Sequence, residues 1–485
     1  MTRTSRNAFR RRWLGTVLGL TATLALVACG AGGVGGIAGV GSGGTGSFTS
    51  GSISGFGSVI VNQIHYDESG ATIRTEDDRA LQPGQLQLGM VVEINGSEAV
   101  TSPNGQRRST ASRIALRSEI EGPVSVVNAA NGTMTVLGQI VRVNARTVFD
   151  SDLAGGLRAV QPGDILEVYG FQDADGNYLA SRVDREAARP ASYKLRGAVR
   201  GLDTAGRSFR IGALTVGYPV STDVSGLQNG AQVRVLLDPQ SGQGERWNAT
   251  RVDIQSGSVI SNPPGVDQLH VELEGIVTAF SSPRRFSVNG VDVDASAVAF
   301  IPANLGLGSR VEVDGDYAQG VIRATEVELD DEDGNDMRGD FELEGPIANL
   351  DTVAQTFTLR GVTVAYGGAR FSGGDAGGLA DGVQVEVEAR LAEDGSTLVA
   401  REIEFDDDRS GADQGGDFEL AGRIASVNAA ESSFVLRNYT VRYAGAQFDE
   451  GTAAGLAAGR LVEVEGRLQA DGRTVIASRI EFDEE

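Results

Sequence analysis

The chain has 485 residues, a formal net charge of −23 at pH 7 and hydrophobic residues at 40% of its positions. A chain this acidic lacks the basic footprint that nucleic-acid phosphates require, and it lacks an electrostatic attraction to anionic lipid. Its length and hydrophobic content are sufficient for several packed domains.

The N-terminus has the pattern of an export signal. Three arginines, Arg10 to Arg12, precede an apolar run at 14–27 that is too short to span a bilayer. The run ends in "LVAC" at 26–29, which resembles the bacterial lipobox, where the cysteine sulfur becomes the attachment point of a diacylglyceryl lipid. Cys29 is also the one cysteine of the chain. We therefore predict a signal peptide over residues 1–28 and lipid attachment at Cys29; an ordinary secretory signal with a chance cysteine is the alternative.

The residues after Cys29 bear on location. Gly30 stands where an Asp would favour retention at the inner membrane, so resemblance to lipoprotein sorting in Gram-negative bacteria favours the outer membrane, on its periplasmic side or at the cell surface. No later stretch is long and apolar enough for a transmembrane helix. Residues 29–57 are rich in Gly and Ser and almost without charge, which predicts a flexible tether.

One pattern recurs through the rest of the chain. "DFELEG" at 340–345 returns as "DFELAG" at 417–422, and the segments around them align without a gap at an offset of 77 residues. The apolar residue before the last two letters of this opening is Leu343 in the first segment and Leu420 in the second. More divergent earlier copies have it at Ile120, Leu195 and Leu273. We predict six tandem repeats, the first atypical as terminal repeats often are. Their bounds are 58–117, 118–186, 193–254, 270–329, 340–406 and 417–485.

Each repeat is predicted to contain five short strands. In the last repeat these cover 418–427, 433–437, 439–443, 461–468 and 475–482. Apolar residues alternate with Glu along them, which indicates one buried and one wet face. A loop or short helix at 449–459 interrupts the series after the third strand and places Leu456 in the core. This order favours an all-β fold of six small closed barrels resembling the OB-fold, and closure removes exposed strand edges.

The lipobox, the Gly-rich tether, "SGFGSVIVN" at 54–62 and the repeated "ELEG…VEVEG" pattern together resemble bacterial lipoproteins of the domain of unknown function 5666 family. The resemblance covers essentially the whole chain after the signal. Its motifs are strand and turn motifs, so it implies a fold, and the family name implies no activity to transfer.

Candidate catalytic groups are few. His65 and His270 each fall in the opening strand of a repeat, and neither a G-x-S-x-G nor an H-E-x-x-H motif occurs. A triad assembled from distant repeats stays an alternative, because triads are recognised by geometry. Paired carboxylates, as at 462–466 and 402–405, are interpreted as a solvated strand face with nothing to raise the pKa of one member. We expect no catalytic, cofactor-binding or metal-binding residues.

Two acidic linkers, 330–336 and 406–413, are the strongest candidates for weak Ca²⁺ binding, since Ca²⁺ takes six to eight oxygen ligands. Their register misses the EF-hand pattern, so a charged, self-repelling spacer is the favoured interpretation. Trp247 could line a groove or pack in a core. In the last repeat, the alternate apolar residues are predicted to be core rather than a ligand platform: Phe434, Leu436, Tyr439, Val441 and Tyr443.

The sequence thus predicts an exported, lipid-anchored, non-catalytic cell-envelope protein that presents barrel modules for binding or scaffolding, with its protein or glycan partner unidentified. The first alternative is a Ca²⁺-dependent stalk or adhesion protein that uses the acidic linkers. An enzyme is the second. A transmembrane β-barrel is the third, and Glu on the outer strand faces argues against it because lipid-facing positions must be apolar.

Overall fold

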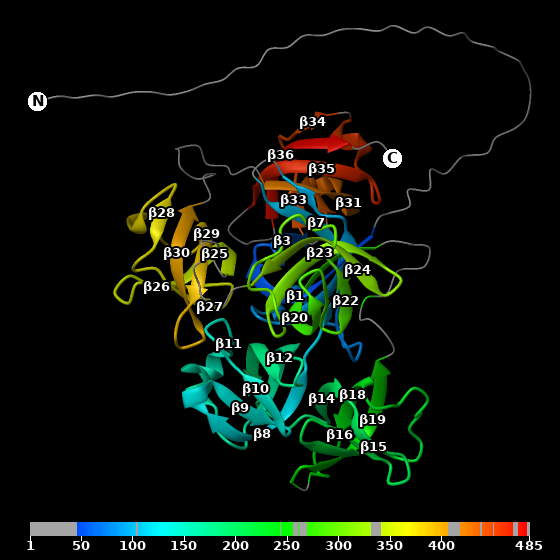
Figure 1. Cartoon of the computed structure of the whole chain (residues 1–485). Helices are drawn as coiled ribbons and strands as arrows, with labels where there is room; N and C mark the ends of the chain where they lie inside the picture. Colours follow the sequence, from blue (N-terminus) through cyan, green and yellow to red (C-terminus); the bar gives the residue numbers. More distant parts are fainter. Residues whose placement is uncertain are drawn as a thin grey trace, which may run out of the picture. The chain divides into compact units, whose positions relative to one another are not determined.

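The computed structural model describes residues 46–482, apart from 103–104, 243, 256–259, 261–268, 331–340, 406–417, 437–438, 450 and 469–473. Its regular elements there are β-strands joined by turns and short 3-10 helices (Figure 1). None of the helices in these ranges is both long enough and apolar enough to cross a membrane. The chain is all-β, as predicted, and forms several small five-stranded barrels.

The strands are grouped below by the predicted repeats. Those of the first are β1 (Gly46–Phe56), β2 (Val59–Val61), β3 (Ile64–Asp67), β4 (Thr72–Thr75), β5 (Val91–Ser97), β6 (Val100–Thr101) and β7 (Arg107–Leu116). Those of the second are β8 (Ile120–Asn128), β9 (Thr133–Val136), β10 (Gln139–Arg142), β11 (Val148–Phe149), β12 (Ile165–Gln172) and β13 (Tyr178–Arg185). Those of the third are β14 (Tyr193–Ala198), β15 (Arg200–Asp203), β16 (Ser208–Ile211), β17 (Leu214–Gly217), β18 (Gln232–Leu237) and β19 (Arg246–Gln255).

The later repeats are more regular. The fourth contains β20 (Leu269–Ser282), β21 (Arg285–Val288), β22 (Val291–Asp294), β23 (Arg310–Ala318) and β24 (Val321–Leu329). The fifth contains β25 (Phe341–Asp351), β26 (Thr356–Leu359), β27 (Val362–Ala365), β28 (Arg370–Ser372), β29 (Gln384–Leu391) and β30 (Thr397–Phe405). The sixth contains β31 (Phe418–Asn428), β32 (Ser433–Leu436), β33 (Tyr439–Arg442), β34 (Gln447–Asp449), β35 (Leu461–Leu468) and β36 (Thr474–Phe482).

The pairing of the fifth repeat shows how a barrel closes. Strand β25 pairs with β26 and β26 with β27, both antiparallel; β27 then runs parallel to β30, β30 pairs with β29, and β29 returns to β25. Strand β25 closes the ring because its first half (341–346) pairs with β29 and its second half (347–351) pairs with β26. The same scheme recurs along the chain, for example in the fourth and sixth repeats. The likeness to the OB-fold stays a prediction.

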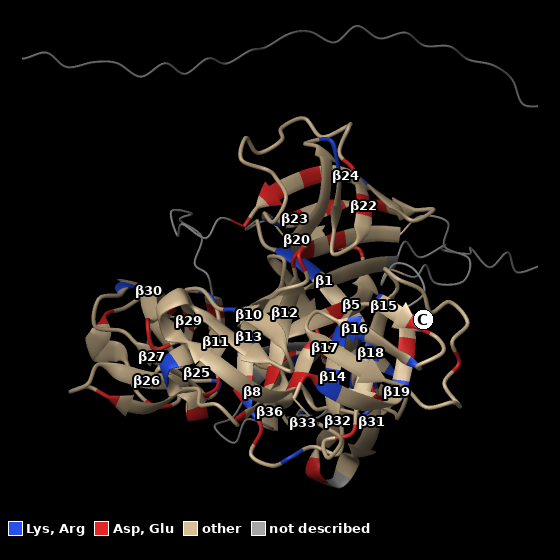
Figure 2. Cartoon of the chain, turned by 60° about the horizontal axis from the view of Figure 1, so that its bottom comes forward, with Lys and Arg blue, Asp and Glu red and all other residues tan. Residues whose placement is uncertain are grey.

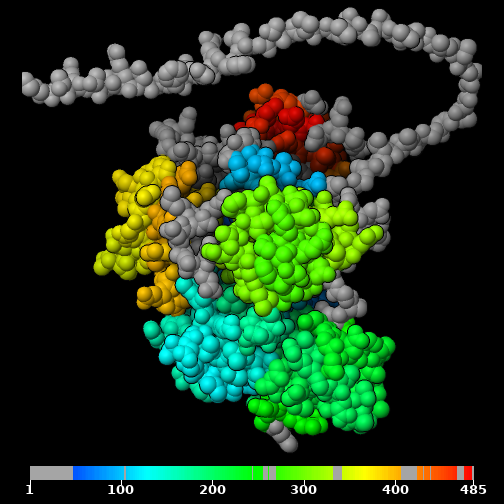
Figure 3. Space-filling view, in the orientation of Figure 1, coloured from blue at the N-terminus to red at the C-terminus, as the bar shows by residue number. Residues whose placement is uncertain are grey.

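Alternation of apolar and polar residues fills each barrel. In β25, Phe341, Leu343 and Ile347 are buried, while Glu342 and Glu344 lie on the outer face. Burying each large aliphatic side chain contributes about 1.5–3 kcal/mol, so the interior of a barrel stabilises it without any ligand. Yellow-green residues of the fourth repeat form one rounded body in the space-filling view (Figure 3).

The prediction of a flexible tether over residues 29–57 is wrong from Gly46 onward. The first repeat begins at Gly46 rather than at residue 58. Strand β1 completes the first barrel by pairing with β5 and β2. It also runs parallel to β20, from Ser47 opposite His270 to Ser50 opposite Leu273, and it reaches β25 at its end. From Gly46 to Phe56 the Gly/Ser composition therefore reflects close packing against several neighbours rather than flexibility.

Two glycines of β1 show why small residues are required. A Cβ at Gly51 would lie 2.8 Å from the Oε2 atom of Glu274, and a Cβ at Gly55 would clash with the backbone carbonyl of Glu342. Glycine permits such close approach of two chain segments. The barrels are joined elsewhere by main-chain contacts too: β8 pairs with β14, and the Phe149 amide donates to the Gly395 carbonyl at 2.7 Å.

The sixth repeat matches its prediction closely. Its strands agree with the predicted ranges to within a residue, and the short strand β34 is additional. Leu456 is buried after the short 3-10 helix at Ala453–Gly455. Of the predicted core residues, Tyr439 is half-buried, and the rest are buried: Phe434, Leu436, Val441 and Tyr443. Trp247 is a packing residue, with its ring edge-on to Tyr193 at 5.4 Å between centroids.

Candidate functional site

Several predicted sites lie outside the described residues. Cys29 does, and so do residues 331–336 of the first acidic linker and all of the second, 406–413. The described member of the first linker is Asp330. Its carboxylate forms ion pairs with Arg146 and with Arg310, the latter at 2.8 Å. This residue therefore joins two repeats through arginines.

Acidic residues line up across the outer face of the fourth barrel. On the adjacent strands β20, β23 and β24, Glu274 stands opposite Glu312, which stands opposite Glu328; Glu272 stands likewise opposite Asp314. Acidic positions recur at intervals along these strands (Figure 2). Like charges directly opposite one another on a sheet are destabilising, so such a face requires nearby cations.

Cations from two repeats supply that compensation. Arg310 hydrogen-bonds Glu274 through its Nε atom at 2.9 Å, and the amide of Ser52 in β1 donates to the same carboxylate at 2.7 Å. Arg107 in β7 is ion-paired with Glu272. Both Glu side chains are buried by these contacts. The fourth repeat thus carries a covered carboxylate face, formed by Glu272, Glu274, Glu312, Asp314 and Glu328.

The interpretation of such carboxylates as a solvated face is wrong for this repeat. Burial, followed by the charges of Glu272, Glu274 and Glu328, raises the pKa of Glu312 to about 8. The interpretation as a solvated face holds better for residues 402–405 and 462–466, for which it was made. There Glu404 is exposed, and Glu463 and Glu465 are half-exposed. Nothing in the polar strand that contains Arg107 signalled in the sequence that this arginine would cover a carboxylate of the fourth repeat.

The two histidines each meet carboxylates. His65 in β3 lies with its Nε2 atom 3.7 Å from Glu342 of the fifth repeat. Burial and then the charge of Arg108 lower the pKa of His65, whereas burial and then the charge of Glu386 raise the pKa of Glu342 to about 7. At pH 7 the contact is therefore between a mostly neutral imidazole and a carboxyl that is only about half ionised, rather than a strong ion pair.

His270 occupies a more charged position. Its Nε2 atom lies 3.4 Å from Asp314 and 3.6 Å from Glu272, and its Nδ1 atom lies 3.9 Å from Asp316. Contacts with Asp314 and then Glu272 raise the pKa of His270 to about 10. This edge of the carboxylate face thus favours a positive charge.

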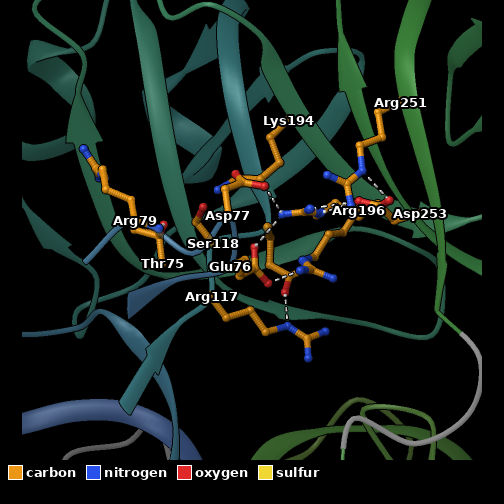
Figure 4. A network of polar contacts seen from close by, with 12 residues as sticks. Thr75, Glu76, Asp77, Arg79, Arg117, Ser118, Lys194, Arg196, Arg251 and Asp253 are labelled. Atoms are coloured by element: carbon orange, nitrogen blue, oxygen red, sulfur yellow. Dashed lines mark hydrogen bonds and ion pairs between the residues drawn. The ribbon is translucent and has the colours of Figure 1, made fainter. Parts of the chain in front are cut away.

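A second polar network joins the first and third repeats (Figure 4). Glu76, just after β4, is ion-paired with Arg196 of β14, and Asp77 lies 2.9 Å from Arg234 of β18. Arg234 also pairs with Asp253 at 2.8 Å. Burial and then the charge of Arg234 lower the pKa of Arg196 to about 10. The network brings opposite charges together across a repeat boundary.

A polar cavity of about 180 Å³ lies where several repeats meet. Its lining includes Ser52 and Asn62 of the first repeat, Ser181 of the second, and Glu274 and Arg310 of the fourth. A cavity of this size admits several water molecules or one small molecule about the size of benzene. It lies beside the covered carboxylate face and shares Glu274, Glu312 and Glu328 with it.

Comparison with known families agrees with the repeat pattern. The model of a domain of unknown function (DUF5666) matches residues 121–184, 274–328, 344–404 and 421–481. These segments fall in the second, fourth, fifth and sixth repeats. A search of curated proteins finds no match to the chain. With its repeated five-stranded barrels and four matched segments, the chain is a tandem-repeat protein of the DUF5666 family.

Proposed function

We propose that the protein is a non-catalytic scaffold of the bacterial cell envelope, exported by its N-terminal signal and held at the outer membrane by a lipid on Cys29. The observation that carries the proposal is that two features occur in one chain. One is a lipobox-like "LVAC" sequence that contains the chain's one cysteine, and the other is an array of barrels with filled interiors. Filled barrel interiors leave the outer faces and loops for contacts with partners.

The contacts between repeats support a scaffolding role. Strand β1 pairs with strands of the first, fourth and fifth repeats, and the ion pairs of Arg107, Arg146 and Arg196 each join a carboxylate from another part of the chain. An array joined in this way would hold its binding surfaces at fixed spacings. Flexibly linked modules would not do so.

Substitution of the cysteine tests the anchor. The full chain expressed in a Gram-negative host should be labelled by a metabolic fatty-acid probe and should partition into the detergent phase on Triton X-114 extraction. Cys29→Ser should abolish the label and move the protein to the aqueous phase, whereas the neighbouring change Gly32→Ser should leave both unchanged. Label retained in Cys29→Ser would contradict the proposal.

A further inference from the structure

A histidine and two carboxylates converge at the edge of the covered carboxylate face. His270 and Glu272 alternate on β20, so both side chains leave the same side of the sheet, and Asp314 stands opposite Glu272 on β23. One ligand atom from each of the three residues lies within 4.8 Å of the others. The set comes from two hydrogen-bonded strands of one barrel, which fixes its backbone geometry.

The distances from the imidazole of His270 to the two carboxylates suit shared binding of a tetrahedral metal ion better than direct hydrogen bonds. The Nε2 atom of His270 lies 3.4 Å from Asp314 and 3.6 Å from Glu272. An N–H···O hydrogen bond is normally about 2.7–3.2 Å long. Ligands placed about 2.0–2.2 Å from a tetrahedral ion lie about 3.3–3.6 Å from one another.

Glu272 provides an independent indication of a missing positive partner. Its side chain is 2% exposed, and its Oε2 atom has no hydrogen-bond partner. Arg107 is bonded through the other oxygen, Oε1. A buried carboxylate oxygen with no donor or cation is energetically costly. The oxygen of Glu272 nearest His270 is Oε1, so a metal ion at the site would share this carboxylate with Arg107, which also lies 3.6 Å from Asp314. Bidentate binding through Oε1 and Oε2 would remove the cost of the unpartnered oxygen.

The second nitrogen of the imidazole is also placed for metal binding. Nδ1 of His270 faces Asp316, whose carboxylate lies 3.9 Å away. Histidine ligands usually direct their other ring nitrogen to a carboxylate, which fixes the ring orientation and the tautomer. Asp316 would act as such a positioning residue.

We propose that His270, Glu272 and Asp314 form a binding site for a single Zn²⁺-like transition-metal ion on the fourth repeat. Imidazole with carboxylates is a ligand set that suits Zn²⁺, and three protein ligands leave a fourth position for water. Ca²⁺ is disfavoured because it takes six to eight oxygen ligands. The site goes beyond the scaffolding role and does not depend on it, since a metal here would stiffen the edge at which β1, β7 and β20 meet.

Calorimetric titration of the metal-free full chain with Zn²⁺ tests the site. The protein should carry no polyhistidine tag and should contain Cys29→Ser, so that its one thiol does not bind zinc. We expect one ion per chain, with a rise in melting temperature. His270→Gln should weaken binding at least about ten-fold. The matched variant His65→Gln removes the other histidine and should bind as the parent does.

Three results would overturn the site. The first is no heat at zinc concentrations up to about 100 μM. The second is equal binding by the parent and His270→Gln, which would show an adventitious ion on the acidic surface only. The third is displacement of bound Zn²⁺ by an equal concentration of Ca²⁺. Asp314→Asn gives a second variant if His270→Gln fails to fold, and it should lose binding in the same way.

Discussion

At the scale of single residues, charge pairs across repeat boundaries are expected to matter more than pairs within a repeat. Glu76→Ala would leave the mostly buried guanidinium of Arg196 without its carboxylate partner. Removing one member of a buried pair typically destabilises by about 3 kcal/mol or more. The urea midpoint of the full chain should therefore fall.

The control is an exposed pair within one barrel. Arg285 lies 3.3 Å from Asp294, and its side chain is 70% exposed. Arg285→Ala should change stability by no more than about 1 kcal/mol, because exposed ion pairs contribute little. Equal urea midpoints for Glu76→Ala and the parent would show that the network of Figure 4 carries no stability.

The raised pKa of Glu342 predicts that its contribution to the stability of the fold decreases as pH rises. Its pKa is raised to about 7, by burial first and then by the charges of Glu386, Glu388 and Glu344, and the neighbouring His65 has a lowered pKa. The favourable contribution of Glu342 is complete below about pH 4.5 and is lost as pH rises through about 7. Glu342→Gln does not ionise, so it should gain stability over the parent at pH 8 and little at pH 5.

Urea unfolding of both proteins at the two pH values measures this difference. The comparison variant is Glu326→Gln, which changes an exposed glutamate on β24. It should follow the parent at both pH values. An advantage of Glu342→Gln that is the same at pH 5 and pH 8 would mean that the carboxyl is not desolvated in the fold.

At the scale of elements, strand β1 is the least expected part of the fold. Gly55→Ala should loosen its end, because the added Cβ meets the Glu342 backbone carbonyl, which cannot move cheaply. Overpacking of this kind costs about 1–3 kcal/mol. Amide hydrogen exchange at 46–56 and at 341–346 should become faster. Gly84→Ala, where nothing lies within 4 Å of the new Cβ, should leave exchange unchanged.

The strands that alternate Glu with apolar residues could be predicted from the sequence, because period two alone fixes which face is buried. The strands of the sixth repeat and the burial of Leu456 are examples. Strand β1 could not, because Gly/Ser composition is equally typical of a linker. Nor could the burial of Glu272 and Glu274: Glu342 and Glu344 occupy the matching positions of the fifth repeat, and they are half-exposed and exposed. The difference lies in Arg310 of the same repeat and in Arg107 of the first repeat, and the sequence pattern does not say which repeat Arg107 covers.

At the scale of the whole molecule, the central claim is that the repeats form a joined array rather than beads on a string. The first repeat contributes β1 to the edges of β20 and β25, far along the chain, and Glu76 to the arginines of the third repeat. Breaking the covalent chain between the second and third repeats should therefore leave these contacts in place.

A protease site inserted after Ala188, in the exposed segment between β13 and β14, makes that break. After complete cleavage, verified by separation of the fragments in concentrated urea, we predict that fragments 1–188 and 189–485 elute together from a size-exclusion column in native buffer. Elution as two separate species in native buffer would contradict the joined array.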